Sequence, residues 1–133
     1  MNFNIFVITD KLEKFYLEAI KEYDKRLTRY CKTRLVYLKN YEQLFNKLSD
    51  KSYKIIISTT GPTITSEELA LQLNNFALTG ISEVTIIIGA PNIPHDEKLT
   101  LSPLDMNLGL QTTILFEQIY RSFRILNNHA YHK

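Results

Sequence analysis

Residues 84–91 read Val84-Thr85-Ile86-Ile87-Ile88-Gly89-Ala90-Pro91 and give the clearest indication of the fold. The first five residues are apolar or β-branched with no alternation, which is typical of a strand covered on both faces. The glycine and the proline that follow end the strand and begin an irregular loop. Ligands of open α/β sheets bind beyond the carboxyl ends of the strands, so this turn is also a candidate binding position.

Other strand-like and helix-like segments alternate along the chain on both sides of this strand. Further strands are predicted at residues 2–8, 34–38 and 53–58, with a brief fifth at residues 99–102. Because strand and helix follow one another repeatedly, we expect an α/β fold. Its sheet should be mainly parallel, with helices on both faces.

Two of the expected helices begin with capping-box spacing. Asp10 and Glu13 form the first box, with Thr9 as the alternative cap, and Thr65 and Glu68 form the second. In such a box each residue satisfies a backbone N–H that the helix itself leaves unpaired. The expected helices cover about residues 10–30, 41–48, 65–80 and 107–126.

Length and composition are those of an ordinary globular protein. The chain has 133 residues, so we expect one domain over residues 1–133 with its own core. No apolar run reaches the roughly 20 residues of a membrane span, and no signal peptide is apparent. The lone Cys31 excludes an internal disulfide and fits a reducing compartment, with a nucleophilic role as the weaker alternative. We therefore expect a cytoplasmic protein without a membrane partner.

Basic residues are unevenly distributed, although the formal net charge is only +2. Acidic residues interleave with the first basic group, so a solvated helix face is the alternative to a nucleic-acid surface. The basic residues in question crowd the first quarter and the end of the chain: Lys11, Lys14, Lys21, Lys25, Arg26, Arg29, Lys32, Arg34, Arg121, Arg124 and Lys133.

The last helix is apolar over more than one stripe. A helix of this kind is either deep in a core or shared with a second subunit. In a chain this short, a large exposed apolar surface would be unusual for a monomer, so a homodimer is the preferred interpretation. Its apolar residues are Leu108, Ile114, Leu115, Phe116, Ile119, Phe123 and Leu126.

Polar side chains that could carry chemistry gather at the end of the chain. His129, Tyr131, His132 and Lys133 all fall within the final five residues, where they suit contact with a charged aromatic partner such as RNA. The two histidines could share a metal ion, but no third ligand accompanies them, so no metal site is predicted. No G-x-G-x-x-G motif or phosphate-binding loop occurs, which argues against an ordinary dinucleotide or P-loop site.

Two glycines close to the ends of strands are candidates for ligand approach. Gly89 follows its strand directly, and Gly61 follows the strand at residues 53–58 by a short extension. Glycine permits a ligand to come close to the backbone, but it is also the ordinary residue of a tight turn. Both interpretations remain open for each glycine.

A set of segments, in order along nearly the whole chain, resembles one known family. Two of them are Leu101-Ser102-Pro103-Leu104-Asp105-Met106 and the terminal Tyr131-His132-Lys133. The family is the ribosomal RNA large subunit methyltransferase H family, a branch of the SPOUT (trefoil-knotted) methyltransferases. The other matching segments are residues 10–16, 22–31, 61, 65–69, 87–89 and 117–121.

This resemblance implies a SPOUT fold with a deep trefoil knot in the C-terminal half. Such a knot is a rare exception, because the chains of nearly all proteins are unknotted. It also implies an obligate homodimer that binds S-adenosylmethionine in the knot. The positions that match the family's cofactor site are Ile57, Gly89, Leu101, Ser102, Pro103, Leu104, Asp105 and Met106.

The resemblance implies methylation of N3 of a pseudouridine in 23S (large-subunit) rRNA on the assembled ribosome. Catalytic and RNA-contacting roles would then fall to the tail residues His129, Tyr131, His132 and Lys133, of which the last three would reach across the dimer. A ribosome partner is expected, and DNA is not.

Several positions depart from the family pattern near the expected cofactor site. Ala90 replaces the second glycine of a pair, and Asp105 stands where the family carries threonine. Asn107 and Leu108 replace a Pro-His pair, and Thr112 replaces an arginine. The alternative function is therefore a catalytically inactive, knotted RNA- or ribosome-binding homodimer.

Overall fold

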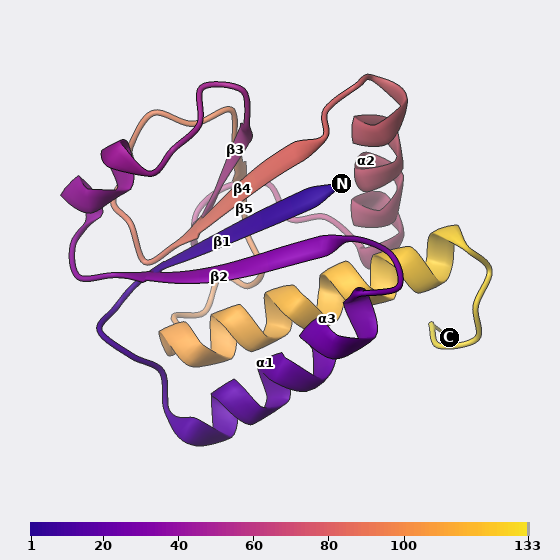
Figure 1. Ribbon diagram of the computed structural model, residues 1–133, viewed down its shortest axis with the longest axis horizontal. Coiled ribbons are helices and arrows are strands. Elements are labelled where there is room, and N and C mark those ends of the chain that lie inside the picture. Colours follow the sequence, from indigo (N-terminus) through magenta and orange to yellow (C-terminus); the bar gives the residue numbers. More distant parts are fainter. Residues whose placement is uncertain (133) are drawn as a thin grey trace.

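The computed structural model describes residues 1–132, and its five strands form one sheet in which every pairing is parallel (Figure 1). The order across the sheet is β2-β1-β4-β3-β5, so β1 and β4 lie near its centre. This confirms the predicted parallel α/β fold. The strands are β1 (Asn2–Ile8), β2 (Lys32–Leu38), β3 (Tyr53–Ile57), β4 (Glu83–Ile88) and β5 (Glu97–Leu99).

Helices cover both faces of the sheet, but unequally. Successive strand residues point to opposite faces, so β1 sends Phe3 toward the helical layer and Phe6 to the other side. The helical layer consists of α1 (Lys14–Leu27), α2 (Ser66–Leu78) and α3 (Leu108–Leu126). The other face is covered by the 3-10 helix η1 (Tyr41–Asn46), through Leu44, and by Ile93 from the loop after β4.

The last helix, α3, packs against both α1 and α2 as well as the sheet (Figure 1). Contact with α1 is close at Gly109, where any Cβ atom would collide with the ring of Tyr16. Packing on three sides explains why the apolar residues of α3 spread beyond one stripe. The homodimer is therefore not required to account for this pattern, and it rests on the family resemblance instead.

The two predicted capping boxes have different outcomes. At the start of α2, the Thr65 hydroxyl accepts from the Glu68 N–H at 3.1 Å, and the Glu68 carboxylate accepts from the Thr65 N–H at 2.9 Å. This prediction is confirmed. The prediction at Asp10 is wrong, because α1 begins at Lys14 with Glu13 as N-cap and without a side-chain capping bond.

A pair of alanine variants separates the two predicted caps. Thr65→Ala should lower the free energy of unfolding by about 1 kcal/mol, because it removes the capping bond of α2. Asp10→Ala should leave it within about 0.5 kcal/mol of the wild type, since Asp10 is exposed and caps no helix. Urea unfolding followed by circular dichroism measures both values. Equal losses for the two variants would contradict this difference.

The fifth strand lies slightly before its predicted position. Residues 97–99 pair with residues 55–57 of β3, whereas residues 99–102 were expected to form the strand. Asp96 fixes this register, because its carboxylate accepts from the Lys54 N–H at 2.8 Å while its own N–H donates to the Lys54 carbonyl at 2.8 Å. As a result, Leu101 and Ser102 lie beyond the strand, where they can line a cavity.

The only cysteine of the chain lies in the core. Cys31 is buried directly before β2, and burial raises the pKa of its thiol to about 12. The reactive form of cysteine is the thiolate, which is scarce near neutral pH at such a pKa. The alternative of a cysteine nucleophile is therefore not supported. Within residues 1–132, none of the helices combines the length and apolarity needed to span a membrane.

Candidate functional site

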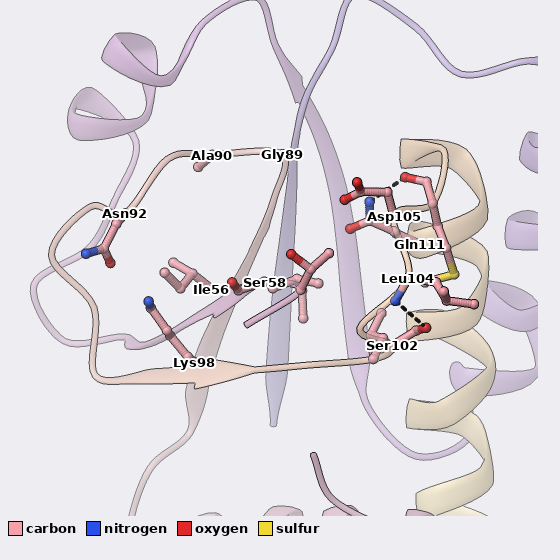
Figure 2. A pocket seen from close by; sticks show the side chains of 14 residues that line it. Ile56, Ser58, Gly89, Ala90, Asn92, Lys98, Ser102, Leu104, Asp105 and Gln111 are labelled. Atoms are coloured by element: carbon pink, nitrogen blue, oxygen red, sulfur yellow. Dashed lines mark hydrogen bonds between the residues drawn. The ribbon is translucent and has the colours of Figure 1, made fainter. Parts of the chain in front are cut away.

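A cavity of about 320 Å³ lies at the carboxyl ends of the central strands (Figure 2). The ends of β3 and β4 form its floor, while β5 and the loop at residues 101–106 form its sides. This is the position at which open parallel sheets bind ligands. The residues that line it are Ile56, Ile57, Ser58, Thr59, Gly89, Ala90, Asn92, Lys98, Leu101, Ser102, Leu104, Asp105, Met106 and Gln111.

The cavity brings together nearly all positions that the sequence assigned to a cofactor. Ile57 comes from the end of β3 and Gly89 from the turn after β4, and the remaining positions come from residues 101–106. Pro103 is the one assigned position that does not line the cavity. Ile57 and Gly89 are 32 positions apart in the sequence, and Leu101 follows 12 positions later, so only the parallel sheet places the three segments side by side.

Gly89 has the geometry of a close-approach glycine. Its φ is +86°, a conformation that L side chains rarely adopt, and a Cβ atom there would lie 3.1 Å from Cδ2 of Leu108. Gly61 also has a positive φ of +145°, but it does not line the cavity. Because Gly89 lines the cavity and Gly61 does not, ligand approach stays a prediction for Gly89 and is not supported for Gly61.

Polar groups in the cavity carry complementary charges on opposite sides. In Figure 2 the ammonium of Lys98, on β5, lies across the cavity from the carboxylate of Asp105, with Ser58 between them. Neither Lys98 nor Ser58 was predicted from the sequence as a site residue. Ser58 could have been found, because it directly follows a buried strand. Lys98 could not, since its position depends on the register of β5.

The loop at residues 101–106 is held in place at both ends. The Ser102 hydroxyl accepts from the Leu104 N–H at 3.0 Å, and the Gln111 side chain donates to the Met106 carbonyl at 2.7 Å (Figure 2). Asn107 then caps α3 by accepting from the Gly109 N–H at 2.8 Å. The backbone of this loop is therefore ordered by the chain itself, which favours ligand binding by a preformed site.

The C-terminal tail folds back along α3. The Tyr131 hydroxyl donates to the Glu117 carboxylate at 2.8 Å, and the Arg121 guanidinium lies 4.7 Å from the centre of the Tyr131 ring. His132 contacts the Glu67 carboxylate and lies 3.1 Å from Nη1 of Arg121. The tail is thus a docked segment with a defined surface.

His129 takes part in a separate contact at the far end of α3. Its Nδ1 lies 2.5 Å from the Tyr30 hydroxyl, which also accepts from Nη1 of Arg124 at 3.2 Å. Burial lowers the pKa of His129, and the nearby Arg29 and Arg124 lower it further. The neutral form of this histidine is therefore favoured near neutral pH.

The tail residues are not brought to the cavity of their own protomer. Neither His129 nor Tyr131 nor His132 lines it, and Lys133 lies outside the described residues. Their predicted role across a dimer stays a prediction. Over residues 1–132, no three His, Cys, Asp or Glu side chains come together in a way that could hold a metal ion.

Comparisons with known proteins agree with this geometry. A family model described as "Predicted SPOUT methyltransferase" matches residues 1–132. The chain is 46% identical, over the full length of both proteins, to ribosomal RNA large subunit methyltransferase H 1 of Thermoanaerobacter sp. (strain X514). It is 34% identical to a putative ribosomal RNA large subunit methyltransferase H of Methanococcus maripaludis and 32% identical to the Acetivibrio thermocellus enzyme, again over full lengths.

These two alignments extend over 159 and 160 positions for a chain of 133 residues, so the present chain has gaps relative to those relatives. The Thermoanaerobacter alignment covers 133 positions and the whole of both proteins, so the shorter form is not unique to this chain. The matches extend over both the sheet and the loop that builds the cavity. The chain belongs to the ribosomal RNA large subunit methyltransferase H family of SPOUT methyltransferases.

Proposed function

We propose that this protein methylates N3 of a pseudouridine in large-subunit rRNA, with S-adenosylmethionine as methyl donor. The assembled ribosome would be the substrate, and a homodimer with a C-terminal trefoil knot would be the active form. The observation that carries the proposal is the cavity beyond β3 and β4, because seven of the eight positions assigned to the cofactor line it. Family membership and the names of the relatives support rRNA as the substrate.

The residues of the cavity fit S-adenosylmethionine. The Lys98 ammonium would pair with the cofactor's carboxylate, and the Asp105 carboxylate would balance its positive charges. Apolar Ile57, Leu101 and Met106 offer surfaces for the adenine, close to backbone groups of a fixed loop. Gly89 lines the cavity, and a side chain there would press on Leu108 and Ile8 and so disturb the wall of the cavity.

The chain contributes positioning more than covalent chemistry. S-adenosylmethionine would supply a methyl group on a sulfonium, which a nucleophilic nitrogen can displace. Residues 101–106 would fix the donor, and the tail would hold the target nucleotide so that N3 lies in line with the methyl group. Such orientation replaces a diffusive encounter and accounts for a large part of catalysis in comparable reactions.

The N3 proton must leave during the transfer, and a tail histidine is the proposed acceptor. A neutral imidazole can take a proton, and the lowered pKa of His129 keeps its ring neutral. Nδ1 of His129 is engaged with Tyr30, whereas both ring nitrogens of His132 contact Glu67 or Arg121, so either histidine remains a candidate and His132 would have to leave one of these contacts. Residues 131–133 would act on the cavity of the second protomer.

A catalytically inactive RNA-binding homodimer is not favoured as the alternative. The departures at the start of α3 are integrated into the fold: Asn107 caps the helix, and Thr112 is fully buried with its hydroxyl donating to the Leu108 carbonyl at 2.8 Å. A relative of the same length bears the methyltransferase name, so the short loops do not by themselves indicate loss of activity.

Cofactor binding is the first test. At 100 times its dissociation constant, S-adenosylmethionine should stabilise the native protein by about 2.7 kcal/mol, which a thermal shift detects. Lys98→Gln should weaken the affinity about tenfold in calorimetry, because it removes a charge-assisted contact. Lys51→Gln, an equal charge change on an exposed residue before β3, serves as the matched control.

Methyl transfer is tested with radiolabelled S-adenosylmethionine and ribosomes that lack the modification. Incorporation should require the uridine at the target position to be isomerised to pseudouridine, and it should exceed incorporation into free rRNA. Absence of both a thermal shift and a heat of binding at millimolar cofactor would refute the proposed activity and leave the RNA-binding alternative.

A further inference from the structure

A groove of about 450 Å³ lies at the opposite end of the molecule from the cofactor cavity. It is formed where α1 ends, where α3 ends and along the second half of α2, at the side of the sheet where the strands begin (Figure 1). Its polar side chains are Arg29, Asn74 and Asn127, and Tyr30 and Phe123 form an aromatic wall. No aspartate or glutamate among residues 1–132 lines it.

Among residues 1–132, no carboxylate neutralises the positive charge at this groove. Arg29 lies 5.4 Å from the centre of the Tyr30 ring, and Arg124 donates to the hydroxyl of the same tyrosine. Within the part of the chain that the structure describes, neither arginine forms an ion pair, and Nε of Arg124 is buried without an acceptor. By contrast, Arg26 and Arg121 each pair with a glutamate one turn away, at 3.0 Å.

The walls of the groove suit a nucleotide. The rings of Tyr30 and Phe123 stack on one another at 5.4 Å with an interplanar angle of 7°, and both line the groove. Asn74 is exposed and makes no side-chain hydrogen bond among the described residues, so its amide is free to bind. Arginine beside aromatic rings and free amides is the combination by which proteins hold single-stranded RNA.

We propose that this groove is a second RNA-binding site, which holds the phosphodiester backbone of the ribosomal RNA away from the target nucleotide. Arg29 would bind a phosphate, while Asn74 and Asn127 would contact the ribose or an unpaired base. The proposal rests on rRNA being the substrate of the cofactor cavity. Charge complementarity favours this occupant, because a phosphate supplies the anion that the uncompensated arginines lack.

The groove lies far from the cofactor cavity of its own protomer. The 19 residues of α3 separate the two, and a helix of this length spans about 28 Å. Contacts at the groove should therefore affect how RNA binds and leave the binding of the cofactor unaffected. This separation makes the proposal testable by comparing RNA affinity with cofactor affinity.

The first test replaces the exposed arginine. Arg29→Gln should raise the KM for unmodified ribosomes about tenfold, with the affinity for S-adenosylmethionine unchanged. It should also reduce the slope of log affinity against log salt concentration by about one, as expected for a lost phosphate contact. Lys47→Gln removes one charge at an exposed position beside η1, on the other face of the sheet, and should change neither value.

A second pair of variants tests the groove without removing an arginine. Ala77 is exposed on α2 and lines the groove, so Ala77→Glu places a carboxylate where a phosphate would bind. Ala77→Gln adds nearly the same volume without charge. The glutamate variant should raise KM several-fold more than the glutamine variant, and both should fold because glutamate and glutamine are good helix formers.

Failure of this proposal differs from failure of the proposed enzyme activity. If S-adenosylmethionine does not bind to the wild type, RNA affinity is measured directly by filter binding, and a tenfold loss in Arg29→Gln still supports the groove. Unchanged KM, RNA affinity and salt slope in both Arg29→Gln and Ala77→Glu would overturn it. The proposal would also be overturned if these variants changed the oligomeric state in size-exclusion chromatography and left the RNA affinity unchanged. The groove would then be a contact between copies of the protein.

Discussion

Gly89→Val should weaken the binding of S-adenosylmethionine by roughly 10- to 100-fold, which corresponds to about 1–3 kcal/mol of overpacking. The φ of Gly89 is +86°, and a Cβ atom there would lie 3.1 Å from Leu108. A branched side chain must therefore shift toward the cavity that Gly89 lines. Isothermal calorimetry measures the loss, and size-exclusion chromatography shows whether the oligomer persists.

Gly80 provides a matched control for this substitution. Its φ of +84° is nearly the same, but a Cβ atom there meets nothing within 4 Å. Gly80→Val should therefore lose stability through backbone strain, about 1–2 kcal/mol, and keep its cofactor affinity. If Gly89→Val does not fold, Gly89→Ala adds only the Cβ atom and allows the same comparison with Gly80→Ala. Equal cofactor affinity in the Gly89 and Gly80 variants would place the cofactor elsewhere.

Deletion of residues 131–133 should reduce methyl transfer to ribosomes about 100-fold and leave the affinity for S-adenosylmethionine unchanged. None of the described tail residues lines the cavity of its own protomer, so the cofactor loses no contact there. The target nucleotide would lose its positioning, and misplacement of about 1 Å can cost this much in rate. Single-turnover transfer with saturating ribosomes separates this loss from weaker RNA binding.

Stability should change little in the truncated protein. Glu117 loses the Tyr131 hydroxyl but keeps its ion pair with Arg121 at 3.0 Å, and Arg124 still donates to the Ala130 carbonyl at 3.0 Å. Tyr131→Phe removes the hydrogen bond to Glu117 and keeps the rest of the tail. Its rate of methyl transfer shows how much of the loss in the truncated protein comes from this hydrogen bond. Full activity of the truncated protein would reduce the tail to a structural element.

The fold class and most residues of the candidate cavity could be predicted from the sequence. Buried strands such as residues 84–88 are recognisable because their apolar and β-branched residues are contiguous. The capping box at Thr65 and the start of the last helix at about residue 107 depend on local sequence, and both predictions are confirmed. The loop at residues 101–106 was identified through the family resemblance, which depends on residues adjacent in the chain.

Other features depend on contacts between residues far apart in the sequence and could be found only in the structure. Asp10 has the right spacing for a cap, but the chain enters α1 three residues later, and no local signal reports this. Lys98 faces the cavity only because Asp96 and Lys54 set the register of β5. Arg29 and Arg124 lie far apart in the sequence, and both contact Tyr30 because α1 and α3 end side by side. Where two helices meet is fixed by the free energy of packing and not by local helix propensity.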